Sequence, residues 1–228
     1  MRNYRRFQRL GFVAAGLALL AVAAGAPVAR AAAPSGLQLA ATLDGKTSYA
    51  AAITYQDSLF QTRWSETWIQ VGQGFSLKAA QDGKAYSYLG SADKVCNIGS
   101  GAKAICTDLE VNTGMAGWTD TYFLSYYGQR PAEVFRNLPV NLRLSLVHTT
   151  AGCTASACKN AAAYSFRAAD STSQYSGTIW VDAKANRPVE LLETKIMSLG
   201  GMKDTSRTQV VITDWNDSSL KLPAMPKG

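Results

Sequence analysis

The chain has 228 residues, of which 47% are hydrophobic, so it can bury one sizeable core, and no linker rich in Pro, Gly or Ser divides it. Its net charge of +7 is concentrated before residue 32; the rest of the chain has 18 basic and 16 acidic residues, a net charge of about +2. This near balance, with both signs interspersed, argues against a nucleic-acid-binding surface.

The N-terminus has the composition of a secretory signal peptide. A basic segment with Arg5 and Arg6 precedes an apolar run of about 17 residues from Leu10 to Ala26. The small residues Ala29 and Ala31 then form a cleavage site. We therefore expect residues 1–31 to be a signal peptide and residues 32–228 to be a single exported domain. The alternative is an uncleaved membrane anchor, because about 17 apolar residues are the short limit for crossing a bilayer.

The four cysteines form two local pairs, Cys96 with Cys106 and Cys153 with Cys158. In an exported chain this spacing predicts two disulfides that each close a small loop. A redox or metal role is the alternative, but neither spacing matches a zinc site and the chain has a single histidine. We expect no metal and no cofactor.

A short helix and a series of strands are predicted in the first part of the exported region. Leu39 and Leu43 lie four residues apart behind Ser35, which is the pattern of an amphipathic helix with its N-terminal cap. Short turn-rich segments then separate β-type runs, which predicts successive antiparallel hairpins. These runs cover residues 48–56, 62–71, 74–80, 84–90, 94–98 and 104–109.

A second helix and a one-sided strand follow. Pro131 to Leu138 is predicted to be a short helix with proline at its first position, and Pro139 ends it. From Val140 to Thr149 apolar and polar residues alternate, as in a strand with one face toward the core. The apolar face carries Leu142, Leu144, Leu146 and His148.

The remaining strands are predicted at residues 161–168, 177–182, 189–196 and 205–215. The turns between the last three are too short for parallel crossovers, so these strands form an antiparallel meander. About eleven strands with two or three short helices predict a mainly β (α+β) fold. We expect a strongly curved antiparallel sheet that forms a half-open β-barrel covered by a few short helices.

The closing meander resembles that of a known family. A glycine opens a short apolar strand that ends in aspartate, Gly177–Asp182, and after a turn Pro188 and Val189 open the next strand. Together with the segments Thr213–Asn216 and Leu222–Pro226, this pattern is similar to that of the LolA-like periplasmic lipoprotein carriers. Their relatives include the RseB-type and LppX/LprG-type lipid-binding proteins. The resemblance implies a half-open barrel with a hydrophobic cavity that takes acyl chains.

No catalytic constellation is apparent. His148 lies at the end of an apolar strand face, where a neutral imidazole is more often structural than a base. No Gly-x-Ser-x-Gly elbow accompanies it. Glu190 and Glu193 are three residues apart in one strand and therefore lie on opposite faces. We predict that the protein is not an enzyme, and a hydrolase is the weakest alternative.

Apolar strand faces supply candidates for a ligand-binding wall. A half-barrel leaves apolar surface that no second sheet covers, and this surface needs a ligand or a lid. Ordinary core packing is the alternative for each of these side chains. The candidate cavity-wall residues are Trp64, Trp68, Tyr122, Leu142, Leu144, Leu146 and Phe166.

These inferences predict a non-catalytic monomer, exported to the periplasm or the extracellular side of the cell envelope. It would bind a lipid or the acyl chain of a lipoprotein in its half-barrel, and no nucleic acid. The alternative is a cell-envelope sensor or scaffold that uses the same fold to bind a partner protein.

Overall fold

The computed structural model describes residues 33–44, 47–91, 94–99, 104–108, 130–139, 142–147, 153–155, 158 and 160–226. Ala33–Gly228 form one compact unit, and residues 1–32 lie outside the described residues. The predicted signal peptide, Tyr122 and His148 therefore all lie outside the described residues. Among the described helices, none has the length and apolar character needed to cross a membrane.

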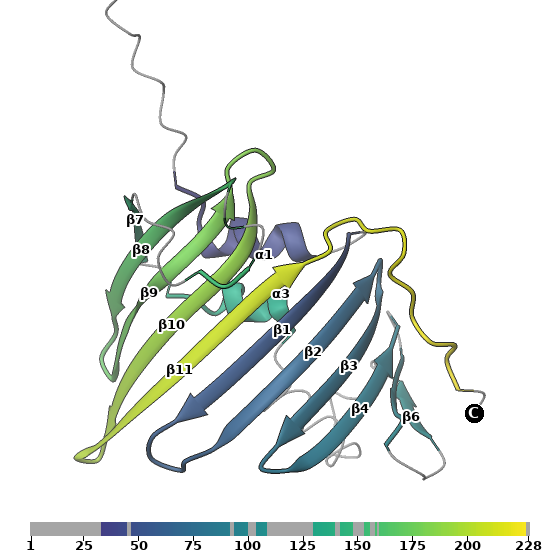
Figure 1. Ribbon diagram of the computed structural model, residues 1–228. Helices are drawn as coiled ribbons and strands as arrows, with labels where there is room; N and C mark the ends of the chain where they lie inside the picture. The colour runs from purple at the N-terminus through teal and green to yellow at the C-terminus, as the bar shows by residue number, and fades with distance from the viewer. Residues whose placement is uncertain are drawn as a thin grey trace, which may run out of the picture. The chain divides into compact units, whose positions relative to one another are not determined.

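One antiparallel sheet dominates the unit from Ala33 onward (Figure 1). It contains eleven described strands in the order β6-β5-β4-β3-β2-β1-β11-β10-β9-β8-β7, and it is curved without closing. The bounds are β1 Ser48–Asp57, β2 Arg63–Val71, β3 Gly74–Gln81, β4 Lys84–Gly90, β5 Lys94–Asn97, β6 Ile105–Asp108, β7 Arg143–Val147, β8 Ala161–Ala169, β9 Ser173–Asp182, β10 Arg187–Leu199 and β11 Met202–Thr213. The predicted fold class is confirmed.

The described helices are α1 (Gly36–Leu43) and α3 (Pro131–Arg136), and both lie on one face of the sheet, here called the inner face (Figure 1). Ser35 caps α1 in a capping box, in which its Oγ accepts from the N–H of Gln38 and the Gln38 side chain accepts from the N–H of Ser35. Leu39 of α1 and Phe135 of α3 are fully buried in the main core. The helices therefore cover apolar side chains that the inner face would otherwise expose.

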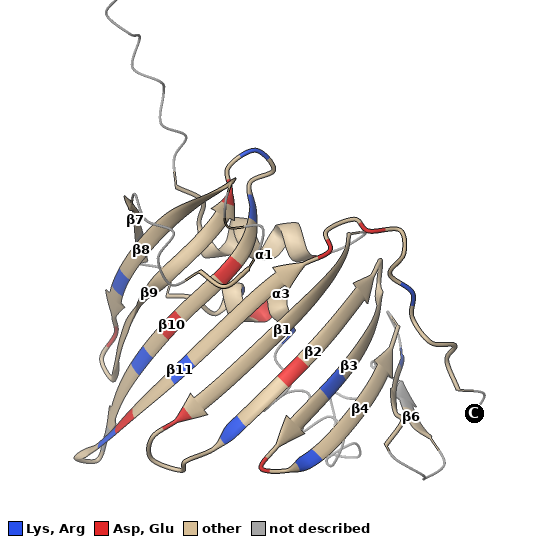
Figure 2. Ribbon diagram, viewed as in Figure 1, with Lys and Arg blue, Asp and Glu red and all other residues tan. Residues whose placement is uncertain are grey.

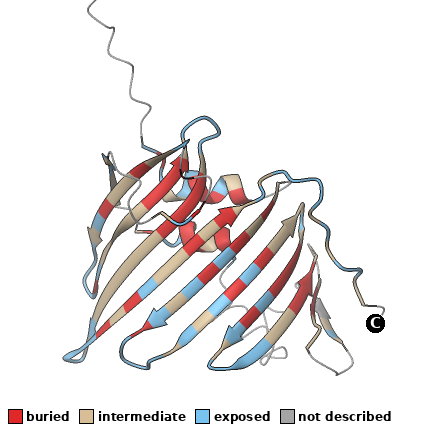
Figure 3. Cartoon of the chain, viewed as in Figure 1, coloured by how far each residue is buried: buried red, intermediate tan, exposed pale blue. Residues whose placement is uncertain are grey.

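Burial alternates along parts of β1 and β2 (Figure 3). On β1, Ala51 and Ile53 are buried toward the helices, whereas Ala52 and Thr54, which alternate with them, are exposed. The period of two is the pattern from which the strands were predicted. The strand bounds agree with the prediction to within four residues at each end.

Both predicted disulfides are present. Cys96 and Cys106 lie directly opposite each other on β5 and β6 and join these strands. Cys153 and Cys158 close a loop that precedes β8. Each bond links residues that are close in sequence, so each constrains a local loop of the unfolded chain.

Two glycines on the inner face lie beneath phenylalanine rings on neighbouring strands. Phe75 is paired with Gly90, and Phe166 is paired with Gly177. A Cβ at position 177 would lie 2.7 Å from Cζ of Phe166 and would also meet the carbonyl oxygen of Leu192. The glycine therefore permits a close approach that any other residue would block.

We expect Gly177→Ala to lower the free energy of unfolding by about 1–3 kcal/mol, because the added methyl must displace a buried ring or the backbone. Urea denaturation followed by circular dichroism measures the change. Ser176→Ala, at the adjacent position on the opposite face, is the control and should leave the midpoint nearly unchanged. Equal midpoints for Gly177→Ala and the unmodified protein would contradict this packing.

Candidate functional site

A cleft of about 660 Å³ lies between the inner face of the sheet and the C-terminal end of α3. Its volume falls within the range of small-molecule sites, which is about 300–1,000 Å³. The lining residues are Ile53, Tyr55, Asp57, Phe60, Thr62, Trp64, Val134, Asn137, Tyr175, Glu193, Lys195, Met197, Asp204, Ser206 and Thr208. The cleft is therefore built by β1 and β2, by β9, β10 and β11 from the last part of the chain, and by α3.

Strand register arranges the floor of the cleft in rows that cross the sheet, because directly paired residues point to the same face. The first row, next to the helix-covered core, consists of Glu66, Ile53, Val210 and Leu191. The middle row consists of Trp64, Tyr55, Thr208 and Glu193. The third row, farthest from the core, consists of Asp57, Ser206, Lys195 and Tyr175. Polarity therefore rises from the helix-covered core toward the end of the sheet that carries the β1–β2 loop.

The middle row provides an aromatic platform. The rings of Tyr55 and Trp64 stack with centroids 4.4 Å apart and an interplanar angle of 23°. Both side chains are half-buried, so part of each ring faces the cleft. Stacked aromatic rings present a flat apolar surface with little conformational entropy to lose, which suits contact with an apolar ligand.

The charged groups of the cleft lie on its polar side. Burial raises the pKa of the Glu193 carboxyl, and the charge of Lys195 partly opposes this shift. The ammonium of Lys195 lies 5.3 Å from the ring centroid of Tyr175, within the range of a cation–π contact. Asp57 and Asp204 are buried, and their carboxylates accept hydrogen bonds from backbone N–H groups of the β1–β2 loop. These two aspartates therefore fix the backbone of the β1–β2 loop, which forms part of the cleft wall.

Glu66 is a buried acid at the end of the first row. Its side chain is 2% exposed, and the indole N–H of Trp68 donates to its Oε2 at 2.7 Å. Oε1 has no hydrogen-bond partner within the part of the chain that the structure describes. Burial raises the pKa of Glu66 from 4.5 to about 8, and the hydrogen bond from Trp68 lowers it by less. The carboxyl is therefore mostly protonated at neutral pH.

The predicted wall residues have different positions in the structure. Trp64 lines the cleft. Trp68 and Phe166 are buried in the main core, and Leu142 and Leu144 pack against it. Leu146 is 37% exposed and lies outside the cleft lining. Tyr122, as stated above, lies outside the described residues.

Sequence reasoning missed the contribution of β10 and β11 to the cleft. Glu193, Lys195 and Met197 share the inner face with buried Leu191. A change along one strand face from leucine to charged residues is a sequence signal for the edge of a core. Glu66 carries a similar signal, because it alternates with Trp64 and Trp68 on one face.

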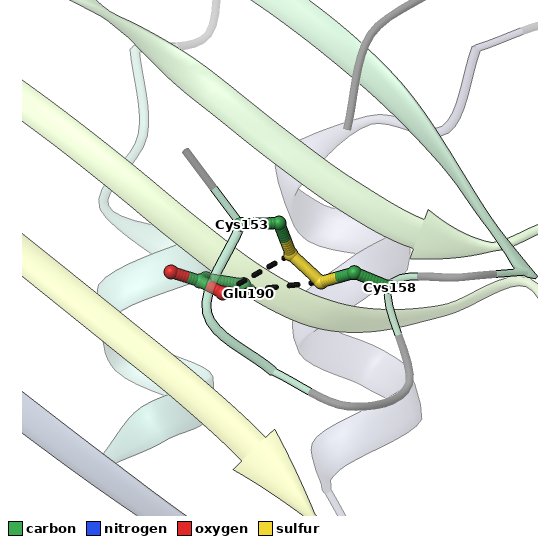
Figure 4. Close-up of side chains that lie close together, drawn as sticks. All are labelled: Cys153, Cys158 and Glu190. Atoms are coloured by element: carbon green, nitrogen blue, oxygen red, sulfur yellow. Dashed lines mark hydrogen bonds between the residues drawn. A yellow bond between two sulfur atoms is a disulfide. The ribbon is translucent and has the colours of Figure 1, made fainter. Parts of the chain in front are cut away.

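A second cluster lies on the outer face, where the Cys153–Cys158 loop covers Glu190 (Figure 4). Glu190 is fully buried and accepts hydrogen bonds from the backbone N–H groups of Thr154 and Ala155, at 2.7 and 3.0 Å. The Thr154 hydroxyl and the Gln209 amide also donate to it, at 3.0 and 2.8 Å.

The sulfurs of this loop also approach the carboxylate. Sγ of Cys153 lies 3.1 Å and Sγ of Cys158 lies 3.9 Å from Oε2 of Glu190. Two cysteines and a glutamate at these distances resemble a metal-ligand set, but metals bind thiolates, and these sulfurs are bonded to each other. We interpret Glu190 as the anchor that fixes the disulfide loop to the sheet.

Comparisons with known proteins identify no family. No family model matches the chain, and no curated protein matches it. Among solved structures, the chain is similar to one described as the crystal structure of MucB in complex with MucA(peri). The sequence identity is 8% and the TM-score is 0.15, with 78% of this chain and 92% of that chain covered. A TM-score this low supports no inference about fold or function.

Glu66→Gln should stabilise the protein at neutral and alkaline pH. Between pH 4.5 and 8 the folded state binds a proton at Glu66 that the unfolded state has lost, so stability falls as pH rises through this window. Glutamine removes this cost, and we expect a gain of about 2–4 kcal/mol at pH 8 that nearly vanishes at pH 4.5. Urea denaturation across this range measures the effect, with exposed Asp214→Asn as the control. An effect of Glu66→Gln on stability that does not change with pH would contradict the buried acid.

Glu190→Ala should destabilise the protein by about 3 kcal/mol, because two buried backbone N–H groups and the Gln209 amide lose their acceptor. Thermal unfolding with the disulfides intact measures the loss. Lys184→Ala, in the exposed turn before β10, should behave like the unmodified protein. Retention of full stability in Glu190→Ala would show that the loop needs no anchor.

Proposed function

We propose that the protein is an exported, non-catalytic LolA-like half-barrel that binds a lipid or the acyl chain of a lipoprotein in the inner-face cleft. The observation that carries this proposal is the gradient of polarity along the cleft. Its inner end is formed by Ile53 and Val134, and its outer end by Asp57, Lys195 and Asp204. An amphiphile has the same gradient, with an apolar chain and a polar head.

The size and lining of the cleft fit a chain of moderate length. Burial of apolar surface contributes roughly 0.8 kcal/mol per methylene, so about ten buried methylenes suffice for micromolar affinity. The stacked Tyr55 and Trp64 rings offer a flat wall for such a chain. In this arrangement the acyl chain lies toward Ile53, and its head group lies near Glu193 and Lys195.

The proposed binding involves no chemistry on the ligand. The two aspartates of the described lining are hydrogen-bonded to the β1–β2 loop, so their role is structural. These assignments support a binding site in preference to an active site.

Export is supported by two features of the chain. Disulfides persist in oxidising compartments, and both cysteine pairs are bonded here. The basic and apolar N-terminal segment has the composition of a secretory signal. These features support the proposal that the protein resides in the periplasm or on the extracellular side of the envelope.

A second candidate is a sensor or scaffold that binds an envelope protein. The observation that favours it is that much of the inner face is already filled, because Trp68, Phe75 and Leu191 are buried in one core with residues of α1 and α3. A filled face leaves less space for a ligand. A pull-down from envelope extract separates the two candidates, because a scaffold retains its partner after delipidation and a carrier does not.

Trp64→Ala should weaken uptake of a fluorescent fatty acid about tenfold or more, since truncation removes one ring of the aromatic platform. A fluorescence titration of detergent-free protein measures the change. Thr67→Ala is the matched control, because Thr67 lies on the outer face of the same strand and is exposed. Native mass spectrometry should also show lipid on protein purified without detergent. Ligand-free protein that takes up no fatty acid would refute the proposal.

A further inference from the structure

Three large apolar side chains are exposed on two neighbouring loop tips at the polar end of the cleft. Phe60 and Leu59, in the β1–β2 loop, are 76% and 40% exposed, and Met202, at the start of β11, is 56% exposed. The two tips are adjacent because β1 pairs with β11 up to Asp57 and Ser206, and the N–H of Ser58 donates to the carbonyl of Thr205. We refer to Leu59, Phe60 and Met202 as the apolar tip.

The β1–β2 loop is held firmly in the conformation that exposes these side chains. Asp204 accepts from the N–H groups of Ser58 and Leu59 at 3.2 and 3.0 Å, and Asp57 accepts from the N–H of Phe60 at 2.7 Å. Both carboxylates are more than nine-tenths buried. A loop with so many fixed backbone groups cannot turn its apolar side chains inward, so their exposure is a built feature of the fold.

Two exposed basic side chains flank the apolar tip in the chain. Lys203 follows Met202 directly and Arg63 follows the loop, and both side chains are exposed. The two nearest acids, Asp57 and Asp204, are buried under the loop. Figure 2 shows basic and acidic residues interspersed along this end of the sheet. The exposed acids at this end, Asp82 and Asp170, lie on the β3–β4 and β8–β9 turns and each accept a backbone N–H.

We infer that the apolar tip inserts into the interface of an anionic lipid bilayer and places the cleft against the membrane. Aromatic and aliphatic side chains flanked by Lys and Arg are the combination that binds anionic interfaces. Phe60 also lines the cleft, so its mouth would open toward the lipid. This inference rests on the proposed lipid binding, because it assigns the membrane as the place of ligand exchange.

A protein partner fits the same residues less well. A stable protein interface buries about 800 Å² on each side, whereas the apolar tip consists of three side chains on two narrow turns. Projecting side chains on turns can enter a bilayer interface, which adapts its shape to them, but they do not form the broad complementary surface that a folded partner requires.

Co-sedimentation with vesicles tests the inference. Vesicles of phosphatidylcholine alone and of phosphatidylcholine with phosphatidylglycerol are compared at low and physiological salt. We expect at least about tenfold tighter binding to the anionic vesicles, with weakening as salt rises. The double variant Leu59→Ser, Met202→Ser should lose most of this binding, and neither residue lines the cleft. Leu37→Ser removes a side chain that is 60% exposed on α1 and should bind like the unmodified protein.

Fatty-acid uptake in solution, measured on the same proteins, separates this inference from the proposed function. Loss of vesicle binding with retained uptake in the double variant supports docking by the apolar tip. Uptake by the unmodified protein without vesicle binding overturns the docking inference alone. Vesicle binding without uptake overturns the proposed function alone. Docking by the apolar tip would also be overturned if Leu37→Ser lost as much vesicle binding as the double variant. It would likewise be overturned if the apolar tip cross-linked to an envelope protein and the protein did not bind vesicles.

Discussion

The pairing of β1 with β11 is the interaction on which the rest of the structure depends. It joins the hairpins from the first half of the sheet, β1 to β6, to the meander that closes the chain. The register brings Ile53 opposite Val210, Tyr55 opposite Thr208 and Asp57 opposite Ser206, and these pairs are the centre of the cleft floor. A shift of one residue would turn the inner-face side chains outward on one strand. The core, the cleft and the position of the β1–β2 loop therefore all depend on the register between β1 and β11.

A single curved sheet must also have its inner face covered. The two described helices belong to the core in which Trp68, Leu77 and Leu191 of that face are fully buried. They leave the end with Tyr55, Trp64 and Glu193, where side chains are half-buried and the cleft lies. The chain thus combines a well-packed core with a site that a ligand can enter.

The elements were predictable from the sequence, whereas the cleft was not. Alternation assigns each strand residue to a face, and the assignment of Glu190 and Glu193 to opposite faces is confirmed by their pairing with Val211 and Thr208. Alternation does not say which part of a face a helix covers. Trp64 and Trp68 share a face and a strand, yet Trp68 lies in the core and Trp64 in the cleft. Their difference arises from which residues far away in the sequence pack against each side chain, and local patterns do not encode those neighbours.

Photo-cross-linking with a diazirine-bearing fatty acid measures occupation of the cleft most directly. Mass spectrometry of the labelled protein then identifies the modified residues. The proposed carrier function predicts labels on cleft residues such as Tyr55, Trp64 and Met197, and competition by unlabelled fatty acid. Labels confined to outer-face residues, or no specific label at all, would contradict a ligand-binding cleft.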